Sequence, residues 1–262
     1  MVLHVEKSAQ GLVEVRLARA AQHNAFDDAL ITALREAFQD IATHEDVRAV
    51  HLWGEGPSFC AGADIHTMRA AGEMDMAENQ AAAQAMSDMF AAIYDCPVPV
   101  IAHVHGAVYG GGLGLVAAAD MVVAESATRF RLSEVRIGLS PATIAPFVLR
   151  AIGARHAVRY FTTAELFDAV TARDMGLVHH VAADGEAARA QVVHWWEALK
   201  SAGPQAVRAS KALVRDLAGQ PITPALRTDT AKRIALRRAH DEGREGLAAF
   251  LEKRRPAWDM DA

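Results

Sequence analysis

Cysteine is scarce in this sequence: Cys60 and Cys96 are its two cysteines, and they form no CxxC pair. The scarcity excludes a small domain held together by disulfide bonds. Two free thiols suit a reducing compartment, and we therefore expect a cytoplasmic protein. The 262 residues, 52% of them hydrophobic and 23% charged, have the composition of a globular protein with a large core.

The sequence also lacks an excess of positive charge. The formal net charge is −5, and no basic field marks a surface for nucleic acid, so we expect no nucleic-acid partner. The arginines and lysines of 232–255 are interleaved with acids and apolar residues, which is typical of an amphipathic helical face.

No apolar run is long enough to cross a membrane. The most apolar zone, 98–124, is broken by Pro99, two histidines and five glycines, whereas a spanning helix needs about 20 apolar residues with few breakers. The first seven residues lack the basic and apolar regions of a signal peptide. We expect neither a membrane partner nor a secretory leader.

Motifs for metals and for common nucleophiles are missing too. Twelve histidines are present, yet none belongs to an HExxH motif or to a cluster with cysteines, so we expect no metal site. The chain has no GxSxG sequence and no Walker loop, so neither an α/β-hydrolase nor a P-loop nucleotidase is indicated.

What is present is a strand–helix alternation followed by helices alone. Strands are predicted over 11–17, 47–53, 98–104 and 121–124. Helices are predicted to begin at Asp27–Asp28 and to cover 77–94, so the fold class is α/β. The pattern is helical throughout over 184–201, 204–218, 222–239 and 240–254. We expect a core of residues 1–200 and a C-terminal helical region of residues 201–262, divided at Ser201–Pro204.

The strongest local feature is the glycine-rich turn Tyr109–Gly114, which lies between a predicted strand and a predicted helix. Glycine lets a backbone approach a ligand closely, and the first N–H groups of a helix have no partner within it. Such groups suit an anion or a developing oxyanion. A tight turn packed against a neighbouring backbone would have the same sequence, and both interpretations stay open at this point.

A dinucleotide site is one alternative for this turn. Gly112-x-Gly114-x-x-Ala117 matches the loose GxGxxA motif, and Glu134 lies about 20 residues further on, where a ribose-binding acid would fall. Asp120 and the next predicted strand, however, cut the helix short, and the motif lies deep in the chain rather than in its first βα unit. We therefore disfavour this interpretation.

A second strand-to-helix turn, Ser58–Asp64, offers another helix start with free N–H groups. Alone it indicates only a turn. Together, the starts at 62–64 and 110–112 provide two backbone donors that could hold one oxygen atom. Glu134 adds a carboxylate between apolar residues, just before Pro141. This setting favours a pocket over the solvated surface where a single glutamate usually lies.

Taken together, these motifs resemble those of the enoyl-CoA hydratase/isomerase (crotonase) superfamily. The similarity runs in order along nearly the whole chain, through His23–Phe26, Phe59–Asp64, His105–Gly112, Ala118–Asp120, Phe130–Gly138, Ala172–Val178 and Glu242–Arg254. It implies a spiral of ββα turns with a C-terminal helical region that builds homotrimers, usually paired into homohexamers. It also implies an acyl-CoA thioester as the substrate and no separate cofactor.

The resemblance assigns the catalytic groups. The backbone N–H groups of Ala63 and Gly111 would hold the thioester oxygen, and Glu134 corresponds to one of the two glutamates that hydratases usually carry. Gly114 occupies the position of the second glutamate. This departure favours a single-carboxylate mechanism, and we expect the glycine to widen the pocket for a branched or carboxylated acyl chain.

The resemblance also assigns the CoA-binding residues. The carbonyl near Ala61 would contact the adenine, and His66 stands where relatives often carry a lysine near the CoA phosphates. Ala25 and Asp64 belong to the same motifs and complete the set. The segment Ser140–Phe147 replaces the usual Pro-Gly-Gly-Gly-Gly stretch and resembles the subgroup that hydrates methylglutaconyl-CoA and isohexenylglutaconyl-CoA.

The expected reaction is that of a hydro-lyase, which adds water across the C2=C3 bond of an α,β-unsaturated acyl-CoA. One alternative is a Δ3,Δ2-enoyl-CoA isomerase, because a single base suffices to move a proton between C2 and C4. Another is a non-catalytic acyl-CoA-binding protein. Gly114 would fit such a binder, but the retained Glu134 and the two glycine turns disfavour it.

Overall fold

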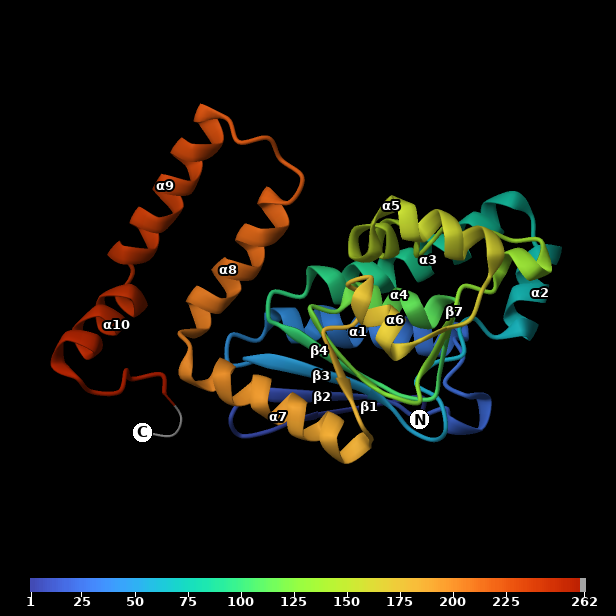
Figure 1. The fold of residues 1–262 in the computed structure, drawn as a ribbon, viewed down its shortest axis with the longest axis horizontal. Coiled ribbons are helices and arrows are strands. Elements are labelled where there is room, and N and C mark those ends of the chain that lie inside the picture. The colour runs from blue at the N-terminus through green and yellow to red at the C-terminus, as the bar shows by residue number, and fades with distance from the viewer. Residues whose placement is uncertain (260–262) are drawn as a thin grey trace.

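Residues 1–259 are described in a computed structural model, in which two β-sheets and ten α-helices form an α/β fold (Figure 1). The larger sheet has the strand order β1–β2–β3–β4–β6–β9, with β1 antiparallel to β2 and the other neighbours parallel. Its strands are β1 (Leu3–Lys7), β2 (Leu12–Leu17), β3 (Ala49–Gly54), β4 (Val100–Val104), β6 (Met121–Glu125) and β9 (His180–Ala182). The smaller sheet consists of β5 (Ala107–Tyr109), β7 (Arg129–Arg131) and β8 (Phe167–Asp168). The predicted α/β class is confirmed.

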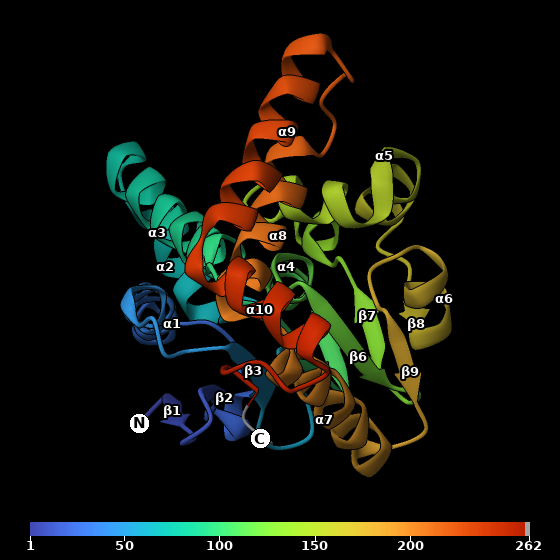
Figure 2. The same cartoon turned by 90° about the vertical axis from the view of Figure 1, so that its left-hand side faces the viewer.

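The helices of the core lie on both faces of the larger sheet. Helix α7 covers one face, and α1, α3 and α4 lie on the other (Figures 1 and 2). The core helices are α1 (Asp28–Thr43), α2 (Ile65–Glu73), α3 (Met76–Asp95), α4 (Gly111–Ala118), α5 (Ala145–Thr163), α6 (Ala169–Asp174) and α7 (Gly185–Ser201). Two short 3₁₀ turns, η1 (Ala20–Gln22) and η2 (Glu134–Ile137), complete this part of the chain.

Helix α1 shows how the local sequence produces this layer. The Asp27 carboxylate accepts a hydrogen bond from the Leu30 N–H at 2.8 Å, which satisfies one of the unpaired donors of the first turn. The apolar residues that recur at three- and four-residue spacing are all buried: Leu30, Ile31, Leu34, Phe38 and Ile41. Each such side chain removed from water stabilises the fold by roughly 1.5–3 kcal/mol. The helix predicted to begin at Asp27–Asp28 is confirmed.

Helix α4 runs through the centre of the core. Seven of its eight residues are buried, because no face carries a polar side chain that needs water. The helix follows β5, and its N-cap residue Gly110 donates its N–H to the Arg131 carbonyl of β7 at 2.9 Å. The start of α4 is therefore fixed to the smaller sheet by a backbone hydrogen bond.

Helix α7 covers a second, smaller apolar cluster that contains Ile101, Val123, Ala182, Ala188 and Val192. Two buried histidines reach carboxylates on adjacent strands, His51 to Glu14 at 3.2 Å and His103 to Glu125 at 3.1 Å. Burial lowers the pKa of His103, and the Glu125 carboxylate opposes that shift. Among residues 1–259, no group of three or more His, Cys, Asp or Glu side chains is arranged to hold a metal ion.

The C-terminal helices extend away from the sheets (Figures 1 and 2). They are α8 (Pro204–Leu217), α9 (Pro224–Ala239) and α10 (Asp241–Glu252). Helix α8 is tied to the core by Lys211, whose ammonium group contacts the Val98 carbonyl at 2.9 Å and the Asp120 carboxylate at 2.5 Å. Ser201 ends α7, close to the expected boundary of the 1–200 and 201–262 regions, which stays a prediction; residues 260–262 lie outside the described part.

Both cysteines are free and buried. Burial raises the pKa of the Cys60 thiol to about 12, so the reactive thiolate is not populated near neutral pH. The cytoplasmic location expected from the cysteine content stays a prediction. Within residues 1–259, no helix combines the length and the apolar character that a membrane crossing requires.

Candidate active site

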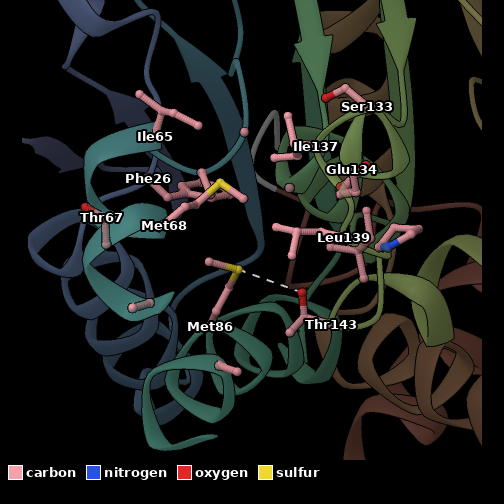
Figure 3. A pocket seen from close by; sticks show the side chains of 18 of the residues that line it. Phe26, Ile65, Thr67, Met68, Met86, Ser133, Glu134, Ile137, Leu139 and Thr143 are labelled. Carbon is pink, nitrogen blue, oxygen red and sulfur yellow. Dashed lines mark hydrogen bonds between the residues drawn. The ribbon is translucent and has the colours of Figure 1, made fainter. Parts of the chain in front are cut away.

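A pocket of about 490 Å³ lies between α2 and α3 on one side and the segment from η2 to the start of α5 on the other (Figure 3). Both glycine turns and Glu134 contribute to its lining. In Figure 3, Phe26 and Met68 stand opposite Glu134, Ile137 and Leu139. The structure therefore brings together motifs that lie up to about 110 residues apart in the sequence, from Phe26 to Glu134.

The first glycine turn is held by backbone pairing with the segment before α1. The Phe26 N–H donates to the Gly62 carbonyl at 2.7 Å, and the Asp64 N–H donates to the Phe26 carbonyl at 2.8 Å. Gly62 has a φ of +94°, and a Cβ there would lie 2.8 Å from the Tyr109 carbonyl oxygen, so only glycine fits. The N–H of Ala63, which lines the pocket, has no acceptor among residues 1–259.

The second glycine turn starts α4. Gly110 has a φ of +48° and serves as the N-cap residue. The N–H of Gly111 has no acceptor in the described chain, as is usual for the first residue of a helix. A Cβ on Gly62 would lie 3.4 Å from the Gly111 nitrogen. The two turns thus pack directly against each other and present two free N–H groups at neighbouring points of the pocket lining.

Glu134 begins η2 and faces this same turn. A Cβ on Gly110 would lie 3.1 Å from Glu134 Oε1. The other carboxyl oxygen, Oε2, is buried and has no hydrogen-bond partner among the described residues. Burial raises the pKa of Glu134, because an ionised carboxylate without partners is disfavoured away from water. A carboxyl group in this state suits proton transfer to and from a bound ligand.

The structure contradicts the expectation that Gly114 widens the pocket. Gly114 does not line it, because neighbouring side chains occupy the space a larger residue would take. A Cβ at this position would lie 2.5 Å from Ile144 Cγ2 and 2.7 Å from Phe90 Cε1. Ile144 itself lines the pocket. The position of a second glutamate is thus closed by an apolar wall, not opened as a cavity.

The expected CoA-binding residues separate into two groups. Ala61 lines the pocket, whereas Ala25, Asp64 and His66 do not. Asp64 caps α2 by accepting the His66 N–H at 2.9 Å, and its carboxylate lies 3.6 Å from Arg19. Arg19 also donates to the carbonyl of Ala25, which is buried. Ala25 and Asp64 thus have structural contacts of their own, and their CoA-binding roles, like that of the exposed His66, stay predictions.

Several residues that line the pocket belong to no sequence motif and were not identified as site residues from the sequence. Met68 comes from α2, Met86 from α3, and Thr143 from the turn before α5. Thr143 Oγ1 lies 3.8 Å from Met86 Sδ, and the pair faces across one end of the pocket (Figure 3). The sequence around Met68 and Met86 predicts only helices, and the sequence around Thr143 predicts only a loop. Nothing local shows that these elements meet around one cavity.

Known proteins are similar to this chain in both sequence and fold. Residues 7–261 match the family Enoyl-CoA hydratase/isomerase. The enoyl-CoA hydratase AKT6-1 of Alternaria alternata is 35% identical over 205 residues, covering 78% of this chain and 67% of the relative. Human mitochondrial methylglutaconyl-CoA hydratase is 29% identical over 262 residues, covering 98% of this chain and 76% of the relative. The crystal structure of an enoyl-CoA hydratase from Shewanella pealeana superimposes with a TM-score of 0.94 at 36% identity, covering 98% of this chain and 96% of that one. The chain belongs to the enoyl-CoA hydratase/isomerase family.

Proposed function

We propose that this enzyme hydrates an α,β-unsaturated acyl-CoA at its C2=C3 bond. One observation carries the proposal: the Glu134 carboxyl group lies against Gly110, beside the N–H of Gly111, and neither that N–H nor Glu134 Oε2 has a hydrogen-bond partner within residues 1–259. A base next to backbone donors is the arrangement that addition of water to a conjugated thioester requires. The family membership supports the acyl-CoA substrate.

The two free N–H groups supply the electrostatic part of the mechanism. As water adds at C3, negative charge develops on the thioester oxygen. Ala63 and Gly111 would donate to that oxygen from turns that are in contact. Loss of one such donor typically raises the barrier by about 3–4 kcal/mol. A structure with a bound acyl-CoA should place both nitrogens roughly 2.7–3.1 Å from the thioester oxygen.

Glu134 would perform both proton transfers. Its carboxylate takes a proton from water as the oxygen of that water bonds to C3, and the π electrons of C2=C3 move toward the thioester. The carboxyl group then returns the proton to C2, so that no proton is gained or lost overall. One carboxylate suffices when water and C2 lie on the same side of the substrate. The apolar wall of Ile144 at the second-glutamate position fits this single-carboxylate scheme.

The isomerase remains the second candidate, because the same single base would move a proton between C2 and C4. Absorbance of the conjugated enoyl thioester separates the possibilities. Hydration of crotonyl-CoA removes the band, isomerisation of a Δ3-enoyl-CoA creates it, and a protein that only binds acyl-CoA changes neither. We expect loss of the band with crotonyl-CoA, and an enzyme that acts only on Δ3-enoyl thioesters would contradict the proposed hydratase.

The acyl group we propose is short and branched or carboxylated, as in methylglutaconyl-CoA. The support is the segment 140–147, of which Ser140, Pro141, Thr143 and Ile144 line the pocket, together with the similarity to human methylglutaconyl-CoA hydratase. A panel of purified enoyl-CoA thioesters tests this directly. A highest kcat/KM for a long unbranched chain would refute it.

For the assembly we propose a homotrimer or a homohexamer built by the C-terminal helices. Apolar side chains of α9 and α10 are exposed in the single chain: Ile234, Leu236, Leu247, Phe250 and Leu251. Such a surface is typical of an interface. Sedimentation at micromolar concentration tests the proposal, and a monomer would contradict it.

A further inference from the structure

Among the described residues that line the active-site pocket, Arg136 is the one with a positive charge. Its guanidinium forms no ion pair or hydrogen bond with any residue of 1–259, although most of the protein's other arginines have such partners. The side chain is exposed rather than buried. An unpaired guanidinium at the wall of a substrate pocket is available to a ligand.

We propose that Arg136 determines specificity by binding a carboxylate carried by the acyl group of the substrate. The inference rests on the proposed function and names the substrate class more closely: short enoyl-CoA thioesters with a second, negatively charged end. Guanidinium groups bind carboxylates through two parallel N–H···O bonds, which fixes the position as well as the charge of the bound group.

The position of Arg136 favours the acyl group over the phosphates of CoA. Arg136 and Glu134 both line the pocket and belong to the same 3₁₀ turn, η2. They are separated by about 4 Å along its axis, although successive residues of such a helix point about 120° apart. Glu134 acts at C2 and C3, so a tail carboxylate lies only a few bonds from it. The CoA phosphates, by contrast, lie at the far end of the pantetheine arm.

The rest of the pocket explains why a carboxylate would need this partner. Around Glu134 the lining is largely apolar, with Met68, Met86, Ile137, Leu139 and Ile144. A carboxylate left without a partner in such surroundings is strongly disfavoured. The lining acids, Asp28 and Glu134, would repel it, so Arg136 offers the single attractive charge on the wall formed by residues 1–259.

The test compares two substrates in variants of the intact enzyme. trans-Glutaconyl-CoA carries the tail carboxylate, and trans-2-hexenoyl-CoA is a neutral chain of similar length. The measured quantity is the ratio of kcat/KM for the first substrate to kcat/KM for the second. Arg136→Gln should lower this ratio roughly 10- to 100-fold, as expected for a lost charge-assisted pair. Arg136→Lys, which keeps the charge but not the two parallel N–H donors, should give a ratio between those of the wild type and Arg136→Gln.

The neutral substrate also shows whether each variant is folded, because its turnover is measured in the same preparation. A ratio that Arg136→Gln leaves unchanged would overturn the inference. So would a loss seen equally with both CoA thioesters and absent with hexenoyl-pantetheine, because that pattern assigns Arg136 to the CoA phosphates. Failure of the wild-type enzyme to hydrate either thioester would instead refute the proposed hydratase function.

Discussion

Substitution of Gly114 by alanine tests whether the position of the missing glutamate is filled. The added Cβ would lie 2.5 Å from Ile144 Cγ2 and 2.7 Å from Phe90 Cε1. Carbon atoms prefer separations of about 3.5–4.0 Å, so both side chains must move by about 1 Å. Ile144 and Phe90 are 1% and 0% exposed, and Phe90 is further held against Phe26 and Phe147 with ring centroids 6.0 and 5.9 Å away. The displacement therefore has little free space to use.

Over-packing of this kind typically destabilises a protein by about 1–3 kcal/mol. For a chain of this size, each kcal/mol lowers Tm by about 2–4 °C, so Gly114→Ala should lower Tm by roughly 2–12 °C. Gly72→Ala is the matched control. Gly72 lies in α2 and has nothing within 4 Å of its Cβ position, so alanine should leave Tm unchanged or raise it.

Thermal unfolding of these two variants, of Ile144→Ala and of the double variant Gly114→Ala/Ile144→Ala decides the question. Removal of the Ile144 side chain deletes the nearest clash, so the double variant should be destabilised by less than the sum of the destabilisations of the two single variants. If Gly114→Ala unfolded within about 1 °C of the Gly72→Ala control, or if the two changes were strictly additive, the packing argument would be refuted.

Three further predictions concern Glu134 and the turn against which it lies. Glu134→Gln should lower kcat at least ~10²-fold with little change in the binding of a CoA ester, as measured by steady-state kinetics and calorimetry; near wild-type turnover would assign the chemistry to another group. Because burial raises the pKa of Glu134, the folded protein holds this proton at a pH where the unfolded chain has lost it. Glu134 therefore destabilises the fold as the pH rises above 4.5, the ordinary pKa of a glutamate. Glu134→Gln should raise Tm at pH 7 but not at pH 4, and a pH-independent difference in Tm would contradict this. Gly110→Ala should lower kcat, because the new Cβ meets Glu134 Oε1 at 3.1 Å, and should also lower Tm, because the φ of +48° disfavours alanine. An unchanged kcat and an unchanged pH–rate profile would show that the contact does not position the carboxyl group.

The C-terminal helices were predicted most accurately from the sequence. Helices expected over 184–201, 204–218, 222–239 and 240–254 are observed as α7, α8, α9 and α10, with ends that differ by at most two residues. Caps explain the accuracy. Asp184 and Thr223 accept hydrogen bonds from the first turns of α7 and α9, and Pro204 and Pro224 occupy first helical positions. Such signals lie within a few residues of the boundary they determine.

Short and exposed strands were missed because their signal is weak. Strand β1 has a single buried residue, Leu3, and its remaining four residues are partly or fully exposed. Strands β5, β7 and β8 have only two or three residues each. Alternation over so few positions cannot be separated from irregular chain. The three short strands are held by pairing between segments far apart in the chain, β5 with β7 and β7 with β8, which a local pattern does not show.

Gly114 shows why part of the site could not be predicted from the sequence. A glycine in place of a glutamate removes a side chain, and from the motif alone that removal looks like additional space. Protein interiors are close-packed, however, so neighbouring residues occupy any volume that a side chain leaves. Here Ile144 and Phe90 do so, and neither residue can be paired with Gly114 from sequence spacing. The missing carboxylate is therefore replaced by an apolar wall, which is why the proposed mechanism assigns both proton transfers to Glu134 alone.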